Sequence, residues 1–195
     1  MSDSVKIQAG KKDPQLSILK AQNEQEFAQA VRMVAEGEMS LQQFFELSNQ
    51  DIDMLAILAN AMYEEERFDD ALVVIEGLIA LNDKNSVYYN AAGAIFIRQE
   101  KFEEALDALN RAIELDPKNL DAYVNRGEVH LLSANLEQSA ADFEKAIAMD
   151  PMESNPSANR ARQLVWGMYE VLKECEKQGF LDPDFIIDDE APDTT

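Results

Sequence analysis

The chain has a single histidine, His130, and a single cysteine, Cys175, so side chains suited to nucleophilic or metal chemistry are scarce. A catalytic nucleophile needs a general base beside it, and a structural zinc ion needs a set of Cys and His ligands. His130 falls in an apolar helical pattern, where we expect it to pack in or near the core rather than to act as a pH switch. We therefore expect no catalytic residues, no metal site and no cofactor.

Carboxylates are abundant, but their spacing does not indicate a ligand set. The chain has 38 acidic and 17 basic residues, for a formal net charge of −21. The acidic run Asp188–Glu190 lacks the alternating ligands and the glycine of a calcium loop, and no glycine-rich phosphate loop is present. The charge argues against nucleic acid and against an anionic membrane surface, since both need clustered Lys and Arg. The polar N-terminus and the single cysteine favour the cytoplasm. The function that these observations leave open is binding to another protein.

A repeat indicates how the chain would build such a contact surface. Residues 71–82 (ALVVIEGLIALN) align without a gap with residues 105–116 (ALDALNRAIELD) and with residues 139–150 (SAADFEKAIAMD), an offset of 34 residues each time. This period resembles the tetratricopeptide repeat (TPR), a pair of short helices that stacks on its neighbours and leaves a concave binding groove. The fold class predicted is therefore all-α, with three tandem TPR helix pairs in a right-handed superhelix.

The same patterns divide the chain into five segments. Residues 1–22 are predicted to be a disordered tail, and residues 23–49 an N-terminal helical segment whose apolar side chains pack on the first repeat or form a weak homodimer. Residues 50–152 hold the three repeats, with helix pairs that begin near Gln50, Asn85 and Asn119. Residues 153–179 predict a C-terminal capping helix, and residues 180–195 an acidic disordered tail.

The first helix of each TPR unit lines the groove, and the register set by Gly93 assigns residues to it. The predicted peptide-binding residues are Ala56, Asn60, Tyr63, Val87, Asn90, Ala94, Ile97, Arg98, Val124, Glu128 and Leu131. Most are apolar, and apolar side chains in an open groove indicate a partner that covers them. The asparagines and Glu128 can bond the backbone of an extended peptide. The alternative is that some of these residues belong to the core.

The groove does not resemble one that grips a free carboxylate. The TPR co-chaperones that bind the acidic C-terminus of heat-shock proteins place Lys and Arg at positions that are Ala56, Asp121 and Asn125 here. Without those cations, a carboxylate would have no charged hydrogen-bond donor.

Three stretches add a closer resemblance. They resemble the SycD/LcrH-like, class II chaperones of type III secretion translocators, and they are Leu55–Tyr63 (LAILANAMY), Arg67–Ala71 (RFDDA) and Leu78–Leu81 (LIAL). The glycine-containing segment Val34–Leu41, which precedes them, resembles the same family. The resemblance spans about residues 25–175. It implies a bacterial cytoplasmic chaperone, not an enzyme, that holds an extended proline-containing segment of a hydrophobic translocator in its groove, with Tyr63 as one wall. The alternative is a generic TPR scaffold in another assembly.

Overall fold

The computed structural model describes residue 29 and residues 32–180, and every regular element among them is a helix. The elements are α3 (Leu41–Phe44), α4 (Asn49–Glu64), α5 (Phe68–Leu81), α6 (Ser86–Arg98), α7 (Phe102–Leu115), α8 (Leu120–Leu132), α9 (Leu136–Ala148) and α10 (Pro156–Gln178). The tail predicted at residues 1–22 lies outside the described residues, and so do residues 181–195 of the predicted acidic tail. No helix in the described part of the chain is long and apolar enough to cross a membrane.

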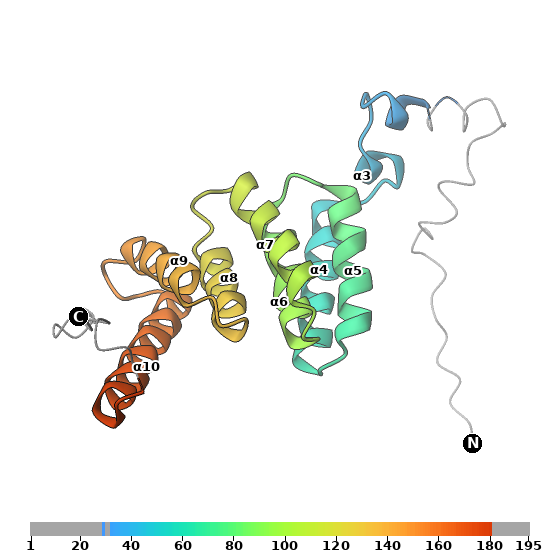
Figure 1. The fold of residues 1–195 in the computed structure, drawn as a ribbon. Coiled ribbons are helices and arrows are strands. Elements are labelled where there is room, and N and C mark those ends of the chain that lie inside the picture. The colour runs from blue at the N-terminus through green and yellow to red at the C-terminus, as the bar shows by residue number, and fades with distance from the viewer. Residues whose placement is uncertain (1–28, 30–31, 181–195) are drawn as a thin grey trace, which may run out of the picture.

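The helices pack as three tandem pairs, α4 with α5, α6 with α7 and α8 with α9, each of which also contacts the next (Figure 1). The predicted all-α TPR fold is confirmed. The pairs begin at Asn49, Ser86 and Leu120, each within a residue of the predicted start. Polar caps explain these starts, because the side chains of Ser48, Asn85 and Asn119 each accept a hydrogen bond from a backbone N–H of the first turn.

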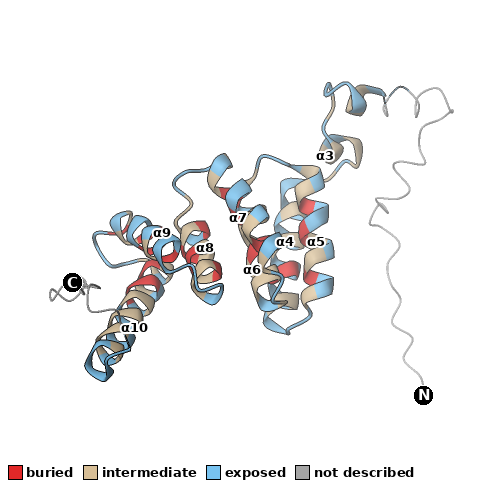
Figure 2. Ribbon diagram, viewed as in Figure 1, coloured by how far each residue is buried: buried red, intermediate tan, exposed pale blue. Residues whose placement is uncertain are grey.

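Small residues let the two helices of a unit approach closely. A Cβ added at Gly93 would lie 2.6 Å from Cγ of Leu109, and one at Gly127 would lie 2.7 Å from Cε1 of Phe143. Leu109 and Phe143 are fully buried, and the buried residues line the faces on which the paired helices meet (Figure 2). The turn inside each unit also repeats, since Glu66, Glu100 and Ala134 all adopt φ of 58–59°.

The C-terminal end of the array is closed by α10. This helix contacts α9 and α8 in the way that α8 contacts α7 and α6, so it stands where the first helix of a fourth unit would stand. The predicted capping helix is present, with Asn155 as N-cap, Pro156 in the first turn and Gly179 in the left-handed conformation that ends it.

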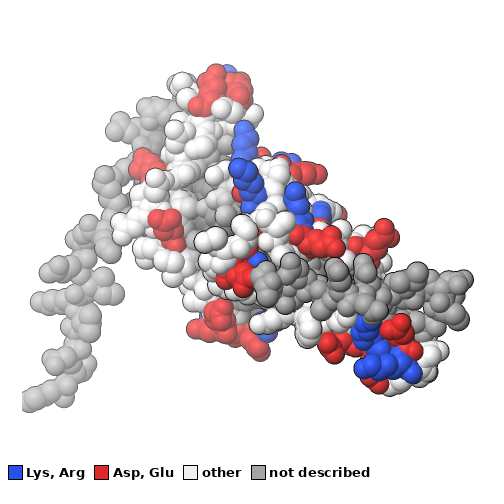
Figure 3. All heavy atoms as spheres, turned by 90° about the vertical axis from the view of Figure 1, so that its left-hand side faces the viewer, with Lys and Arg blue, Asp and Glu red and all other residues white. Residues whose placement is uncertain are grey.

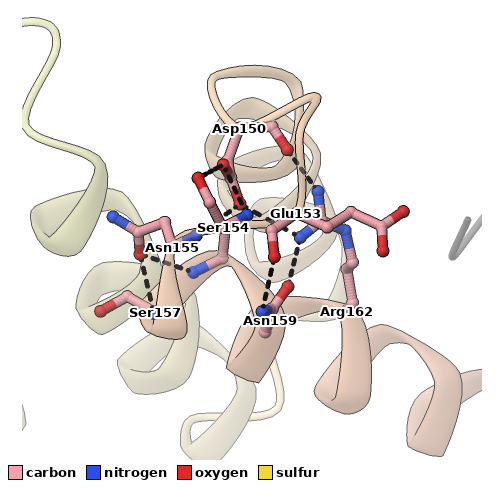
Figure 4. Close-up of polar contacts among 8 residues, drawn as sticks. Asp150, Glu153, Ser154, Asn155, Ser157, Asn159 and Arg162 are labelled. Atoms are coloured by element: carbon pink, nitrogen blue, oxygen red, sulfur yellow. Dashed lines mark hydrogen bonds and ion pairs between the residues drawn. The ribbon is translucent and has the colours of Figure 1, made fainter.

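A buried polar cluster fixes the angle at which α10 leaves α9 (Figure 4). The Asp150 carboxylate accepts hydrogen bonds from the backbone N–H of Ser154 and Asn155, at 3.2 and 3.0 Å. The Arg162 guanidinium donates to the Asp150 carbonyl at 2.6 Å and to its carboxylate at 3.4 Å. Arg162 also donates to the Asn159 side-chain oxygen at 2.6 Å, and because Asp150 and Arg162 are both buried, this network holds α10 at its first two turns.

Among the described residues, no helix packs over the N-terminal end of the array as α10 packs over the C-terminal end. Met54, Ile57 and Leu58 are spaced three and four residues apart on α4, and they are 61%, 69% and 44% exposed. The short helix α3 makes a small contact with α5, and it lies beside one end of the first pair in Figure 1. Phe27 and Val31, which the sequence assigns to the N-terminal helical segment, lie outside the described residues.

Candidate peptide-binding groove

An open cavity of about 330 Å³ lies between α4 and α6, the first helices of the first two units. Six of the predicted residues line it, three from each helix: Ala56, Asn60, Tyr63, Val87, Asn90 and Ala94. The remaining lining is also largely apolar and comes from Ala59, Ile75, Tyr88, Ala91 and Ile95. The alanines leave the floor hollow, whereas Tyr63 and the 61% exposed Val87 supply larger side chains at its walls.

The Tyr63 ring is held in place from two sides. It meets the Phe68 ring edge to face at a centroid distance of 5.7 Å. The Arg98 guanidinium lies 5.6 Å from the Tyr63 centroid and 4.9 Å from the Phe68 centroid. Arg98 also pairs with Glu66 at 3.1 Å, which links the ends of α6 and α4. Arg98 therefore supports the tyrosine wall through cation–π contact.

The third unit does not continue the open cavity. Val124 is fully buried in a cluster with Phe143, Ala146 and Ala161, and Leu131 packs against the same cluster beside Leu164 of α10. The expectation that Val124 faces an open groove is wrong, because Val124 is fully buried beneath α10, whereas Leu131 packs against the same cluster and stays half-buried. The register alone does not reveal this, since α10 lies outside the 34-residue period.

Ile97 likewise turns partly into the protein. It packs against the buried cluster of Ala105, Leu109, Ala112, Ala122 and Val129 and does not line the cavity. This is the core alternative that the sequence left open for individual groove residues. Tyr63 and Val87 remain as the large side chains of the open surface.

A string of polar side chains borders the cavity toward α8 and α10. The Asn125 side-chain amide donates to the Asn90 side-chain oxygen at 2.9 Å, and Arg160 donates to the Asn125 side-chain oxygen at 2.7 Å. Arg160 also pairs with Glu128 at 3.3 Å. Glu128 is thus neutralised by α10, while the Asn90 amide nitrogen remains available as a donor. Sequence reasoning missed Arg160 because no repeat register extends to α10.

Acidic side chains flank the cavity. Asp53 lines a neighbouring hollow that shares Tyr88 with it, and the exposed Glu64 follows Tyr63 on α4. Carboxylates are also spread widely over the face of the molecule seen in Figure 3, where Lys and Arg gather in fewer places. The floor of the candidate site is therefore apolar, and its rim carries both carboxylates, such as Asp53, and the cation of Arg98.

His130 has a packing environment. Its side chain is 17% exposed, and Nε2 lies 3.9 Å from the Asp142 carboxylate, which Arg126 already holds with two hydrogen bonds of 2.6 and 2.8 Å. Burial lowers the pKa of His130, with Asp142 opposing that effect and Arg126 adding to it. Nδ1 has no hydrogen-bond partner among the described residues. Nowhere among the described residues is a group of three His, Cys, Asp or Glu side chains placed to hold a metal ion.

Comparison with known proteins agrees with this architecture. Two tetratricopeptide repeat family models match residues 58–119 and residues 92–165. No curated protein sequence matches. The type III secretion translocator chaperone SycD of Yersinia enterocolitica has a similar structure, with 18% identity and a TM-score of 0.58 over 65% of this chain and 96% of SycD.

Two further solved structures are similar over comparable lengths. PcrH, in complex with the chaperone-binding region of PopB, is 23% identical with a TM-score of 0.55, over 59% of this chain and 94% of PcrH. The TPR domain of Arabidopsis OM64 is 27% identical with a TM-score of 0.53, over 58% of this chain and 93% of that domain. Translocator chaperones and another TPR domain match to a similar degree, so these likenesses establish the fold.

Proposed function

Since residues 58–165 make this chain a tetratricopeptide repeat protein, we propose that it is a non-enzymatic, bacterial cytoplasmic protein that binds an extended client segment between α4 and α6. The observation that carries the proposal is the open apolar cavity walled by Tyr63 and Val87. An apolar hollow with a polar border is typical of a surface that a partner covers. The client is held by burial of its apolar side chains.

The class of client that we propose is a hydrophobic secretion translocator, kept soluble by this chain before export. The segments Leu55–Tyr63 and Arg67–Ala71 resemble translocator chaperones, and the fold is similar to SycD and to PcrH, whose structure holds a fragment of PopB. The alternative is a TPR scaffold that joins other proteins, which the likeness to OM64 keeps open. A client with membrane-inserting segments distinguishes the first function from the second.

The dimensions of the cavity limit what it can hold. An extended chain advances about 3.3 Å per residue, and neighbouring helices are about 8–10 Å apart. Client side chains about three residues apart would therefore reach α4 and α6 in turn. Asn60 and Asn90 lie on the cavity wall, where their amides can bond the client backbone. Because α10 packs over Val124, we propose a short anchor over two units rather than three.

Selection from a displayed library of ten-residue peptides tests this proposal. We expect the wild-type chain to enrich peptides with proline and with apolar residues about three positions apart. Tyr63→Ala should weaken a selected peptide about 30-fold or more, which corresponds to about 2 kcal/mol for an aromatic anchor. Phe180→Ala is the matched control, because Phe180 is 75% exposed and lies beyond the end of α10.

The outcome against the proposal is equally definite. Peptides that bind the wild type and Tyr63→Ala with equal affinity would place the binding surface elsewhere. Affinity that falls steeply with salt would indicate that Asp53 and Glu64 bind a basic client, since apolar burial responds only modestly to ionic strength.

A weak homodimer through the N-terminal end of the array forms a second part of the proposal. Met54, Ile57 and Leu58 form an exposed apolar stripe on α4, and terminal repeats without a polar outer face limit solubility. A second copy that meets this stripe would cover it. The high net charge opposes association, so we expect the dimer to be weak.

A further inference from the structure

Charge is divided unevenly along the chain. Residues 1–20 hold four lysines and two aspartates, for a net charge of +2, whereas the remaining residues hold 13 basic and 36 acidic side chains, for a net charge of −23. The N-terminal segment is therefore a basic stretch attached to an acidic protein. Opposite charges of this size attract at the distances that a tether allows.

The basic segment also has an apolar centre. Residues 11–20 read KKDPQLSILK, with lysines at both ends of a proline-containing run. Pro14, Leu16 and Ile18 alternate with polar residues, so in an extended chain they share one face. The apolar face suits the floor of the cavity between α4 and α6, and the lysines at both ends carry a charge opposite to that of the nearby carboxylate of Asp53.

We propose that residues 11–20 occupy the cavity between α4 and α6 of their own chain when no client is bound. The inference rests on the proposed function, because it assigns the same cavity to both occupants. Leu16 and Ile18 would cover the exposed Val87 and the Tyr63 wall, and the flanking lysines would lie near Asp53 and Glu64. The chain thereby shields its own apolar surface from other proteins until a client displaces the segment.

A short stretch of chain joins this segment to the helical array. Eleven residues separate Lys20 from Arg32; this linker would span up to about 40 Å if fully extended and about 25 Å if it is helical from residue 23 onward. A short flexible tether gives an effective concentration in the millimolar range. If the isolated segment binds with a Kd of about 100 μM, the cavity is occupied roughly ten times out of eleven, and a competing client is weakened about tenfold.

The first test measures that competition in the full-length chain. The probe is a fluorescent synthetic peptide of residues 11–20, titrated against the wild type, Leu16→Asp/Ile18→Asp and the matched control Ser2→Asp/Ser4→Asp. The control adds the same two charges to the same tail outside the apolar run. We expect the Leu16→Asp/Ile18→Asp chain to bind the probe about tenfold more tightly than the other two, and further Tyr63→Ala to abolish that gain. Equal affinity for all three chains, or no binding of the probe, overturns the inference.

The second test locates the segment directly. A photo-crosslinking amino acid replaces Leu16 in the full chain, and the monomer band is digested and mapped. We expect crosslinks to α4 near Tyr63 or to α6. Crosslinks to Met54, Ile57 and Leu58, crosslinks only in a dimer band, or none at all overturn occupation of the cavity in the same chain. A library peptide that binds in a Tyr63-dependent manner while residues 11–20 fail both tests leaves the proposed function standing and removes only this inference.

Discussion

Gly127→Ala tests the packing on which the whole array depends. The new Cβ would lie 2.7 and 2.8 Å from two atoms of the Phe143 ring and 3.2 Å from Cβ of Asp142. Phe143 is fully buried, so its ring has no free space to enter, and α8 and α9 must move apart. That movement would also stretch the buried bond of 2.9 Å that the Ser139 hydroxyl donates to the Gly127 carbonyl. Overpacking of this kind costs about 1–3 kcal/mol.

The matched control is Gly77→Ala on the exposed side of α5, where an added Cβ meets nothing within 4 Å. Both substitutions gain about 1 kcal/mol of helix propensity, so the difference between the two variants isolates the packing cost. We expect Gly77→Ala to be more stable than the wild type, and Gly127→Ala to be less stable than Gly77→Ala by about 1–3 kcal/mol.

Guanidinium unfolding followed by circular dichroism at 222 nm measures both variants. In thermal unfolding, the same difference corresponds to about 2–4 °C for each kcal/mol in a chain of this size. If Gly127→Ala is as stable as Gly77→Ala, then α8 and α9 do not approach each other as closely as described, and the glycine is not required there.

Three other perturbations have defined outcomes. The backbone N–H of Asn155 lowers the pKa of Asp150 below 3.8. The stability due to that carboxylate is therefore present above about pH 4 and is lost on further acidification. The melting temperature should accordingly fall less between pH 7 and pH 3 for Asp150→Asn than for the wild type. Burial lowers the pKa of His130 below 6.5, so protonation opposes folding as the pH falls below that value, and His130→Leu should lose less stability than the wild type between pH 7.5 and 5.5. Ile57→Lys should abolish any dimer seen by sedimentation equilibrium without lowering the melting temperature, and an unchanged dimer would mean that the α4 stripe is not the interface.

The repeat positions were predictable because they obey local rules. Ser48, Asn85 and Asn119 mark helix starts through cap chemistry, and Gly93 and Gly127 mark the close approach of paired helices. Each signal is carried by one residue: a Ser or Asn cap before a helix, or a glycine within it. The start of each pair and the end of α10 at Gly179 could therefore be placed within a residue or two.

The candidate site was predictable only where two repeats face each other. Ala56, Asn60, Tyr63, Val87, Asn90 and Ala94 follow the register and line one cavity. Val124 and Leu131 have the same register but lie against α10, whose docking depends on long-range contacts that no local pattern encodes. Arg160 reaches Asn125 and Glu128 for the same reason. The left-handed backbone conformation of Glu66 and Glu100 could not be predicted either, because neither position carries the glycine that normally indicates it.

The buried contact between Arg162 and Asp150 has a consequence for how the molecule comes apart. In stacked repeats each unit is stabilised only by its neighbours, so opening begins at whichever end is held least. The Arg162–Asp150 contact fastens the last helix, whereas the first pair ends in the exposed side chains of α4. Amide protons should therefore exchange fastest in α4 and α5 and progressively more slowly toward α8 and α9, which gives the array a direction of unzipping from its N-terminal unit.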